Sequence, residues 1–166
     1  MAAGPVSGHA FHLGTLLGPA LLLAFWAGWS DVRAWLHRHD DLPSDAVLVA
    51  AALCAGAAVI HALVTPVHFA EDPLYGGFFA VLAIAQLSWA AAVVVRRGPG
   101  LLLLGAAGNI AVVGLWLATR TAGIPLGVAT GRREPLGALD LTCAVLELGV
   151  AVSCMALLRR PEPVPA

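Results

Sequence analysis

The sequence contains no lysine and few charged residues of either sign. Its 166 residues include nine basic side chains, all of them arginine, and ten acidic ones; only 11% of residues are charged and the formal net charge is −1. Soluble domains carry about 25% charged residues, and a nucleic-acid-binding surface needs clustered basic side chains. The composition therefore excludes a soluble globular enzyme, and no nucleic acid is expected among the partners.

Cysteine is also scarce. The three cysteines are Cys54, Cys143 and Cys154, and each lies inside an apolar run. Buried thiols of this kind usually behave as small hydrophobic side chains. A disulfide framework is therefore not expected.

Apolar residues are what the chain has in abundance, at 60% of the sequence with a mean hydropathy of +0.87. A membrane-spanning helix needs about 20 such residues in succession. The sequence predicts an all-α integral membrane bundle of about five transmembrane helices, with the lipid bilayer as its solvent. The expected single domain covers residues 1–160, with helices at 12–29, 46–65, 75–95, 101–119 and 136–158, and a flexible tail at 161–166.

The arginines predict an orientation, because cytoplasmic loops hold the excess of basic residues. With five spans, one side of the membrane collects Arg33, Arg38, Arg96, Arg97, Arg159 and Arg160, and the other collects Arg120, Arg132 and Arg133. This asymmetry predicts a multi-pass protein of the cytoplasmic membrane, with its N-terminus outside and its C-terminus inside.

Two of the expected helices carry ionisable or thiol residues at a spacing of seven, which is nearly two helical turns and keeps one helical face. These residues are Cys54 and His61 in the second helix with His68 just beyond its end, and Asp140, Glu147 and Cys154 along the fifth. If the two helices are neighbours and run in opposite directions, His61 matches Glu147 in depth. His68 then matches Asp140 near the outer surface, and Cys54 matches Cys154 towards the inner one.

Ionisable groups inside a bilayer are costly, so each is a candidate functional residue. Imidazole and carboxylate together bind Zn²⁺ or Cu²⁺, and an added thiol favours Cu(I) or Zn²⁺. The leading hypothesis is a membrane protein that handles copper or zinc at an extracytoplasmic site. The expected outer ligands are His68, Glu71 and Asp140 with help from His9 or His12, while His61 and Glu147 hold a metal ion or a proton deeper in the membrane.

Two amides and two outer residues complete the candidate set. Gln86 and Asn109 lie near the middle of their helices, where they either line a polar cavity with His61 and Glu147 or simply bridge helices. Tyr75 and Arg120 lie near the outer surface. The simpler interpretation of Arg120 is an ion pair with Glu71 or Asp140 that closes the bundle.

Other functions remain open at this point. The polar residues could instead hold together an accessory or scaffold subunit of a larger membrane complex, or a homo-oligomer. A third hypothesis is an enzyme or electron carrier that uses haem or a quinone, with His12 and His68 as the haem ligands. No tight catalytic or metal-binding signature is present, so no catalytic residue is assigned.

Three stretches carry a resemblance, namely residues 66–79 (PVHFAEDPLYGGFF), 107–127 (AGNIAVVGLWLATRTAGIPLG) and 134–140 (EPLGALD). They resemble small multipass membrane proteins of actinobacteria. The resemblance covers roughly the second helix to the C-terminus. It implies a membrane bundle whose outer residues belong together, and it implies no particular activity.

Overall fold

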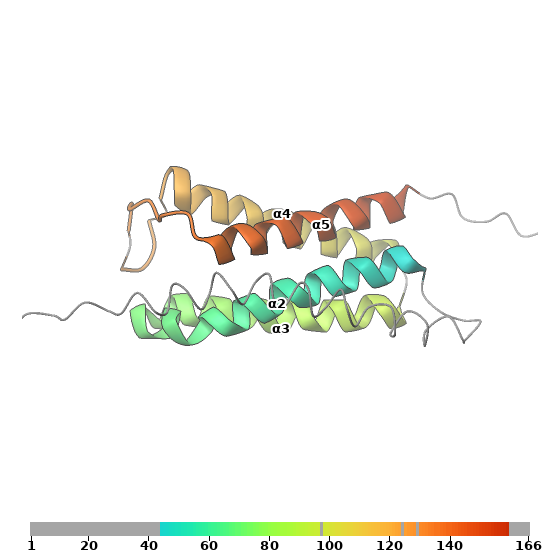
Figure 1. Cartoon of the computed structure of the whole chain (residues 1–166), viewed down its shortest axis with the longest axis horizontal. Coiled ribbons are helices and arrows are strands. Elements are labelled where there is room, and N and C mark those ends of the chain that lie inside the picture. Colours follow the sequence, from blue (N-terminus) through green and yellow to red (C-terminus); the bar gives the residue numbers. More distant parts are fainter. Residues whose placement is uncertain (1–43, 97, 124, 129, 160–166) are drawn as a thin grey trace, which may run out of the picture. The chain divides into compact units, whose positions relative to one another are not determined.

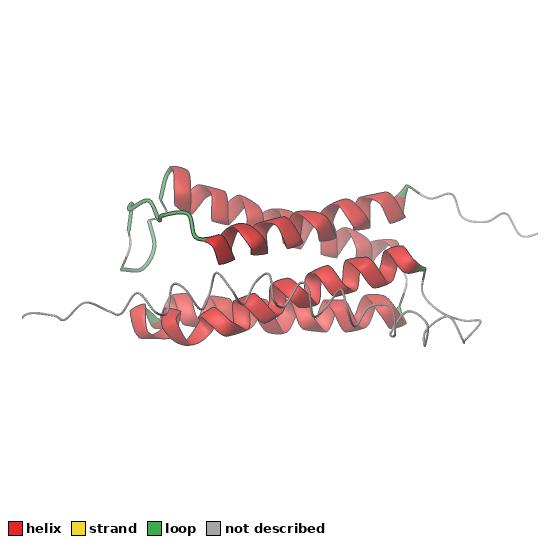
Figure 2. Cartoon of the chain, in the orientation of Figure 1, coloured by secondary structure: helices red, strands yellow, loops and turns green. Residues whose placement is uncertain are grey.

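The computed structural model describes residues 44–96, 98–123, 125–128 and 130–159. Regular structure within these residues is entirely helical, as Figure 2 shows. The four helices are α2 (Asp45–Glu71), α3 (Pro73–Val95), α4 (Pro99–Thr121) and α5 (Ala138–Leu158), labelled in Figure 1. The helix expected at residues 12–29, the histidines His9 and His12 and the tail at 161–166 lie outside the described residues, so the count of about five is not confirmed.

Contacts divide the chain into two units. Of the first unit only Gly137–Thr142 is described, and the second unit comprises Pro43–Leu136 and Cys143–Ala166. In the first unit, the Gly137 amide donates to Asp140 Oδ2 at 3.2 Å. This bond satisfies one of the backbone amides that every helix leaves without an internal partner at its beginning. The helical bundle described below belongs to the second unit.

All four helices are long and apolar enough to cross a membrane. Their outward-facing side chains are large and apolar, among them Val81 at 68% exposure, Ile84 at 67% and Leu104 at 63%. Apolar surface on this scale is unfavourable in water and favourable in lipid. The chain is therefore a membrane protein whose helices contact the bilayer.

Helices α2 and α3 lie side by side as an antiparallel hairpin (Figure 1). One residue, Asp72, separates them. The Asp72 amide donates to the His68 carbonyl at 2.9 Å, and its carboxylate accepts from the Leu74 amide at 2.8 Å. Pro73 then begins α3, where the missing proline amide costs no helical bond. Asp72 thus ends one helix and caps the next.

Helix α2 continues six residues beyond Thr65, where the sequence analysis ended the second span, and it passes through Pro66 to Glu71. Proline removes one helical hydrogen bond, but membrane helices tolerate this because neighbouring groups satisfy the freed backbone. Because α2 extends to Glu71, His68 and Glu71 lie on the helix rather than beyond its end, where they were expected.

Small residues allow the helices of the second unit to approach closely, as is typical of membrane bundles. Ala50 and Ala57 of α2 are fully buried, as are Val93 of α3 and Val150 of α5. Gly105 of α4 lies against the indole of Trp89, and a Cβ added there would overlap the ring. The Trp89 indole donates to the Leu101 carbonyl at 2.8 Å, which fixes the ring in that place.

The loop between α4 and α5 is held at two points. Arg120, near the end of α4, donates to Glu134 Oε2 at 2.7 Å, whereas the sequence analysis considered Glu71 or Asp140 as its partner. The Tyr75 hydroxyl donates to the Leu126 carbonyl at 2.8 Å. Gly127 lies beside that ring with a φ of 66°, and a side chain there would overlap Tyr75, so only glycine fits this turn.

Candidate metal centre

The structure brings His61 of α2 and Glu147 of α5 together. His61 Nε2 lies 3.0 Å from Glu147 Oε1. Both residues are buried, with 6% of His61 and 2% of Glu147 exposed. The pairing expected from the seven-residue spacing is therefore present, and it links two helices that are 86 residues apart in sequence at this point.

Cys143 is the third residue of this site, and it was not among the ligands expected from the sequence. Its Sγ lies 3.4 Å from His61 Nε2 and donates to the Ala57 carbonyl at 3.8 Å. Cys143 and Glu147 are four residues apart on α5, a spacing that places two side chains on the same helical face. That spacing was a usable signal for Cys143. The spacing of seven had pointed to Cys154 instead.

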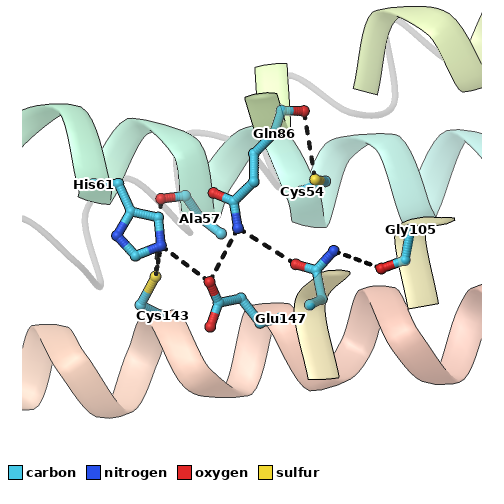
Figure 3. Close-up of polar contacts among 8 residues, drawn as sticks. Cys54, Ala57, His61, Gln86, Gly105, Cys143 and Glu147 are labelled. Carbon is cyan, nitrogen blue, oxygen red and sulfur yellow. Dashed lines mark hydrogen bonds and ion pairs between the residues drawn. The ribbon is translucent and has the colours of Figure 1, made fainter. Parts of the chain in front are cut away.

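His61, Cys143 and Glu147 form a group whose candidate ligand atoms all lie within 4.8 Å of one another. Within the described part of the chain, no other such group of three is found. Figure 3 shows the imidazole, the thiol and the carboxylate converging between α2 and α5. We refer to these three residues as the inner site.

Two amides extend the inner site on the side of Glu147. Gln86 Nε2 donates to Glu147 Oε1 at 3.0 Å and to Asn109 Oδ1 at 3.4 Å, and Asn109 Nδ2 donates to the Gly105 carbonyl at 2.8 Å. These are the only glutamine and the only asparagine in the sequence. Both are buried, so α3 and α4 each contribute their single amide side chain to one network.

The Gln86 side chain retains an unused acceptor. Its Oε1 is buried and has no hydrogen-bond partner among the described residues. In Figure 3 this oxygen points towards the side of the site where His61 lies. An unsatisfied acceptor costs about 1–3 kcal/mol in a buried place, which makes it a natural position for a water molecule or an ion-bound ligand.

His68 lies two turns after His61 on α2. Its Nδ1 lies 2.8 Å from the Val64 carbonyl. A carbonyl only accepts hydrogen bonds, so Nδ1 carries the hydrogen and Nε2 of the neutral ring keeps a lone pair. His68 is thus presented in the tautomer that a metal ligand needs, although it is not part of the inner site.

The remaining candidates make their contacts elsewhere. Asp140 belongs to the first unit, where it accepts from Gly137. Tyr75 and Arg120 bind the loop between α4 and α5, and Glu71 is exposed at the end of α2. His9 and His12 lie outside the described residues, so the outer ligand set stays a prediction.

Cys54 and Cys154, expected to match in depth, are both fully buried in the same apolar cluster. The Cys54 thiol donates to the backbone carbonyl of Gln86 at 3.5 Å. The other buried members of this cluster are alanine, valine and Trp89, which fits cysteines that act as small packing residues.

No family model, no curated protein and no solved structure matches the chain.

Proposed function

We propose that this membrane protein binds a transition-metal ion, preferably Zn²⁺, at the inner site between α2 and α5. The observation that carries the proposal is the convergence of an imidazole, a thiol and a carboxylate within 4.8 Å. These are the three side-chain ligand types that zinc uses in proteins.

The distances support this proposal. Zinc lies about 2.0–2.1 Å from nitrogen, 2.3 Å from sulfur and 2.0–2.2 Å from oxygen, in a tetrahedron. Tetrahedral angles then separate nitrogen from oxygen by about 3.4 Å and nitrogen from sulfur by about 3.6 Å. The corresponding distances here are 3.0 Å and 3.4 Å, each within a few tenths of an ångström of the tetrahedral value, and the thiol and the carboxylate lie within 4.8 Å of each other.

Charge balance favours a divalent ion. A Cys143 thiolate and a Glu147 carboxylate together carry two negative charges, and neutral His61 adds none. Zn²⁺ brings the total to zero, and a neutral site is far less costly at low dielectric than an unpaired charge. Cu(I) would leave one negative charge uncompensated, so we place zinc ahead of copper.

The fourth coordination position would remain open. Three protein ligands and one open position, filled by water or substrate, are typical of catalytic zinc sites, whereas structural sites are closed by four protein ligands. Gln86 Oε1, which lacks a hydrogen-bond partner among the described residues, would accept from a water in that position.

The amides would orient the carboxylate ligand. Gln86 donates to Glu147, and Asn109 holds Gln86 in turn. Partners of this kind fix the orientation of metal ligands.

We further propose the cytoplasmic membrane as the location, with the loop between α4 and α5 outside. The uneven division of arginines between the two ends of the helices supports this orientation.

Elemental analysis of the detergent-purified full chain tests the proposal, after dialysis against zinc and, separately, against copper. We expect about one zinc ion per chain, lost on His61→Ala, Cys143→Ser or Glu147→Gln. Cys154→Ser is the matched control, because it replaces a buried thiol outside the inner site, and it should retain the ion. Circular dichroism and gel filtration would verify that each variant is folded.

Two results would contradict the proposal. Absence of bound zinc and copper from the folded wild-type chain would leave the polar residues as interhelical contacts. The scaffold hypothesis would then be pursued by identifying copurifying membrane proteins. Retention of zinc by folded Cys143→Ser would move the site elsewhere.

A further inference from the structure

One aromatic ring contacts both histidines of α2. The Phe79 ring of α3 lies 4.1 Å from the His68 ring and 5.5 Å from the His61 ring, measured between centroids. These separations are within or just below the range of packed aromatic rings. Phe79 therefore adjoins the inner site on the side towards the end of α2.

His68 is placed to receive a cation at that end. It lies in the last turn of α2, at the end of the hairpin where α2 meets α3. Its Nε2 keeps a lone pair because Nδ1 donates to the Val64 carbonyl. The carboxylates of Glu71 and Asp72 lie three and four residues further along the chain and add negative charge to the same end.

The two histidines differ in exposure. His61 is 6% exposed, whereas His68 is partly exposed. His61 and His68 are seven positions apart on the helix, a rise of about 10 Å along one face. An ion that reaches the inner site from this end meets His68 first and the Phe79 ring next.

We propose that His68 is a transfer ligand that delivers the metal ion to the inner site, and that the Phe79 ring is the gate between the two histidines. This inference rests on the proposed function. His68 captures the ion through Nε2, the Phe79 ring turns aside, and the inner ligands take the ion over. No covalent or redox step is involved.

A gate and a transfer ligand have a specific kinetic signature. Neither contacts the ion in its final site, so neither alters the equilibrium affinity. Removing the gate speeds entry and exit by the same factor, because a lower barrier acts in both directions. Removing the transfer ligand slows entry and exit by the same factor.

Stopped-flow binding of Co²⁺ to the full chain in detergent measures both rates, because cobalt substitutes for zinc and its bond to Cys143 absorbs light. We expect Phe79→Ala to raise the association and dissociation rates by about tenfold each, a change of about 1.4 kcal/mol in the barrier. His68→Ala should lower both rates by a similar factor. Val81→Ala is the control, since Val81 is a residue of α3 that is 68% exposed and makes no ring contact with Phe79, and it should leave both rates unchanged.

Each outcome separates this inference from the proposed function. If the wild-type chain binds no Co²⁺ or Zn²⁺, both fail. If it binds the ion and the rates of Phe79→Ala and His68→Ala equal those of wild type, the inference is overturned and the inner site stands. If His68→Ala weakens the equilibrium affinity as strongly as it slows association, His68 is a ligand of the final site and the transfer role is wrong.

Discussion

The amide of Gln86 gives the sharpest prediction about the inner site, because it touches the ligand Glu147 without being one of the three converging ligands. In Gln86→Leu the side chain keeps a similar volume and loses its hydrogen bonds. The Glu147 carboxylate then loses a donor at 3.0 Å, and Asn109 Oδ1 loses a longer one at 3.4 Å.

The expected magnitude follows from this geometry. Removing the hydrogen-bonding partner of a metal ligand typically costs about 10–100-fold in metal affinity, which is about 1.4–2.8 kcal/mol. The metal-free protein should change little, because interhelical hydrogen bonds in membranes average about 0.6 kcal/mol. The substitution also removes the buried Oε1 that lacks a partner in the described part of the chain.

Asn109→Ala supplies the graded comparison. Its contact with Gln86, at 3.4 Å, is longer than a well-formed N–H···O bond, so we expect a loss of about threefold or less in zinc affinity. Competition of each purified variant with a chromophoric chelator measures the affinity, and thermal unfolding without metal measures stability. The reasoning is refuted if Gln86→Leu binds zinc as tightly as wild type, or no more weakly than Asn109→Ala.

Three further predictions concern the stability of the folded chain. Gly105→Ala should lower the thermal unfolding temperature because its Cβ would overlap the Trp89 ring, whereas Gly108→Ala, with nothing within 4 Å of its added Cβ, should keep or raise that temperature because alanine favours a helix over glycine; equal temperatures of the two variants would refute the close approach. Tyr75→Phe should cost about 0.5–1.5 kcal/mol of stability through the lost bond to Leu126, and it should leave zinc affinity unaltered in the chelator assay. Saturating zinc at 100 times its dissociation constant should stabilise the folded chain by about 2.7 kcal/mol, a shift that scanning calorimetry detects and that a chelator should abolish.

The sequence predicted much of the inner site through periodicity. A repeat of seven keeps a helical face, so the pairing of His61 with Glu147 followed once α2 and α5 were assumed to be neighbours. Cys143 was not predicted as a ligand because a cysteine in an apolar run resembles any small hydrophobic residue. Only its spacing of four from Glu147 indicates a shared helical face. Which thiol faces the histidine depends on helix rotation, which periodicity alone does not fix.

The ends of the helices were harder to predict than their cores. The second helix was expected to end at Thr65, yet α2 reaches Glu71. Membrane helices tolerate an internal proline such as Pro66 because neighbouring groups satisfy the freed backbone. The partner of Arg120 was also missed. Glu134 reaches it through the fold of the loop, which the residue sequence of that loop does not reveal.

The one-residue connection at Asp72 also bears on how the chain enters the membrane. Because α2 and α3 are joined so closely, they can be inserted together as a hairpin, and this brings His61 and Gln86 into the bilayer early in synthesis. Glu147 is made last of the network, and an acidic side chain at the bilayer centre costs roughly 2.5–3.5 kcal/mol on insertion scales. His61 and Gln86, which both contact Glu147 Oε1 in the folded chain, are then already in the bilayer when Glu147 is inserted. The order of synthesis therefore lowers the cost of inserting this carboxylate.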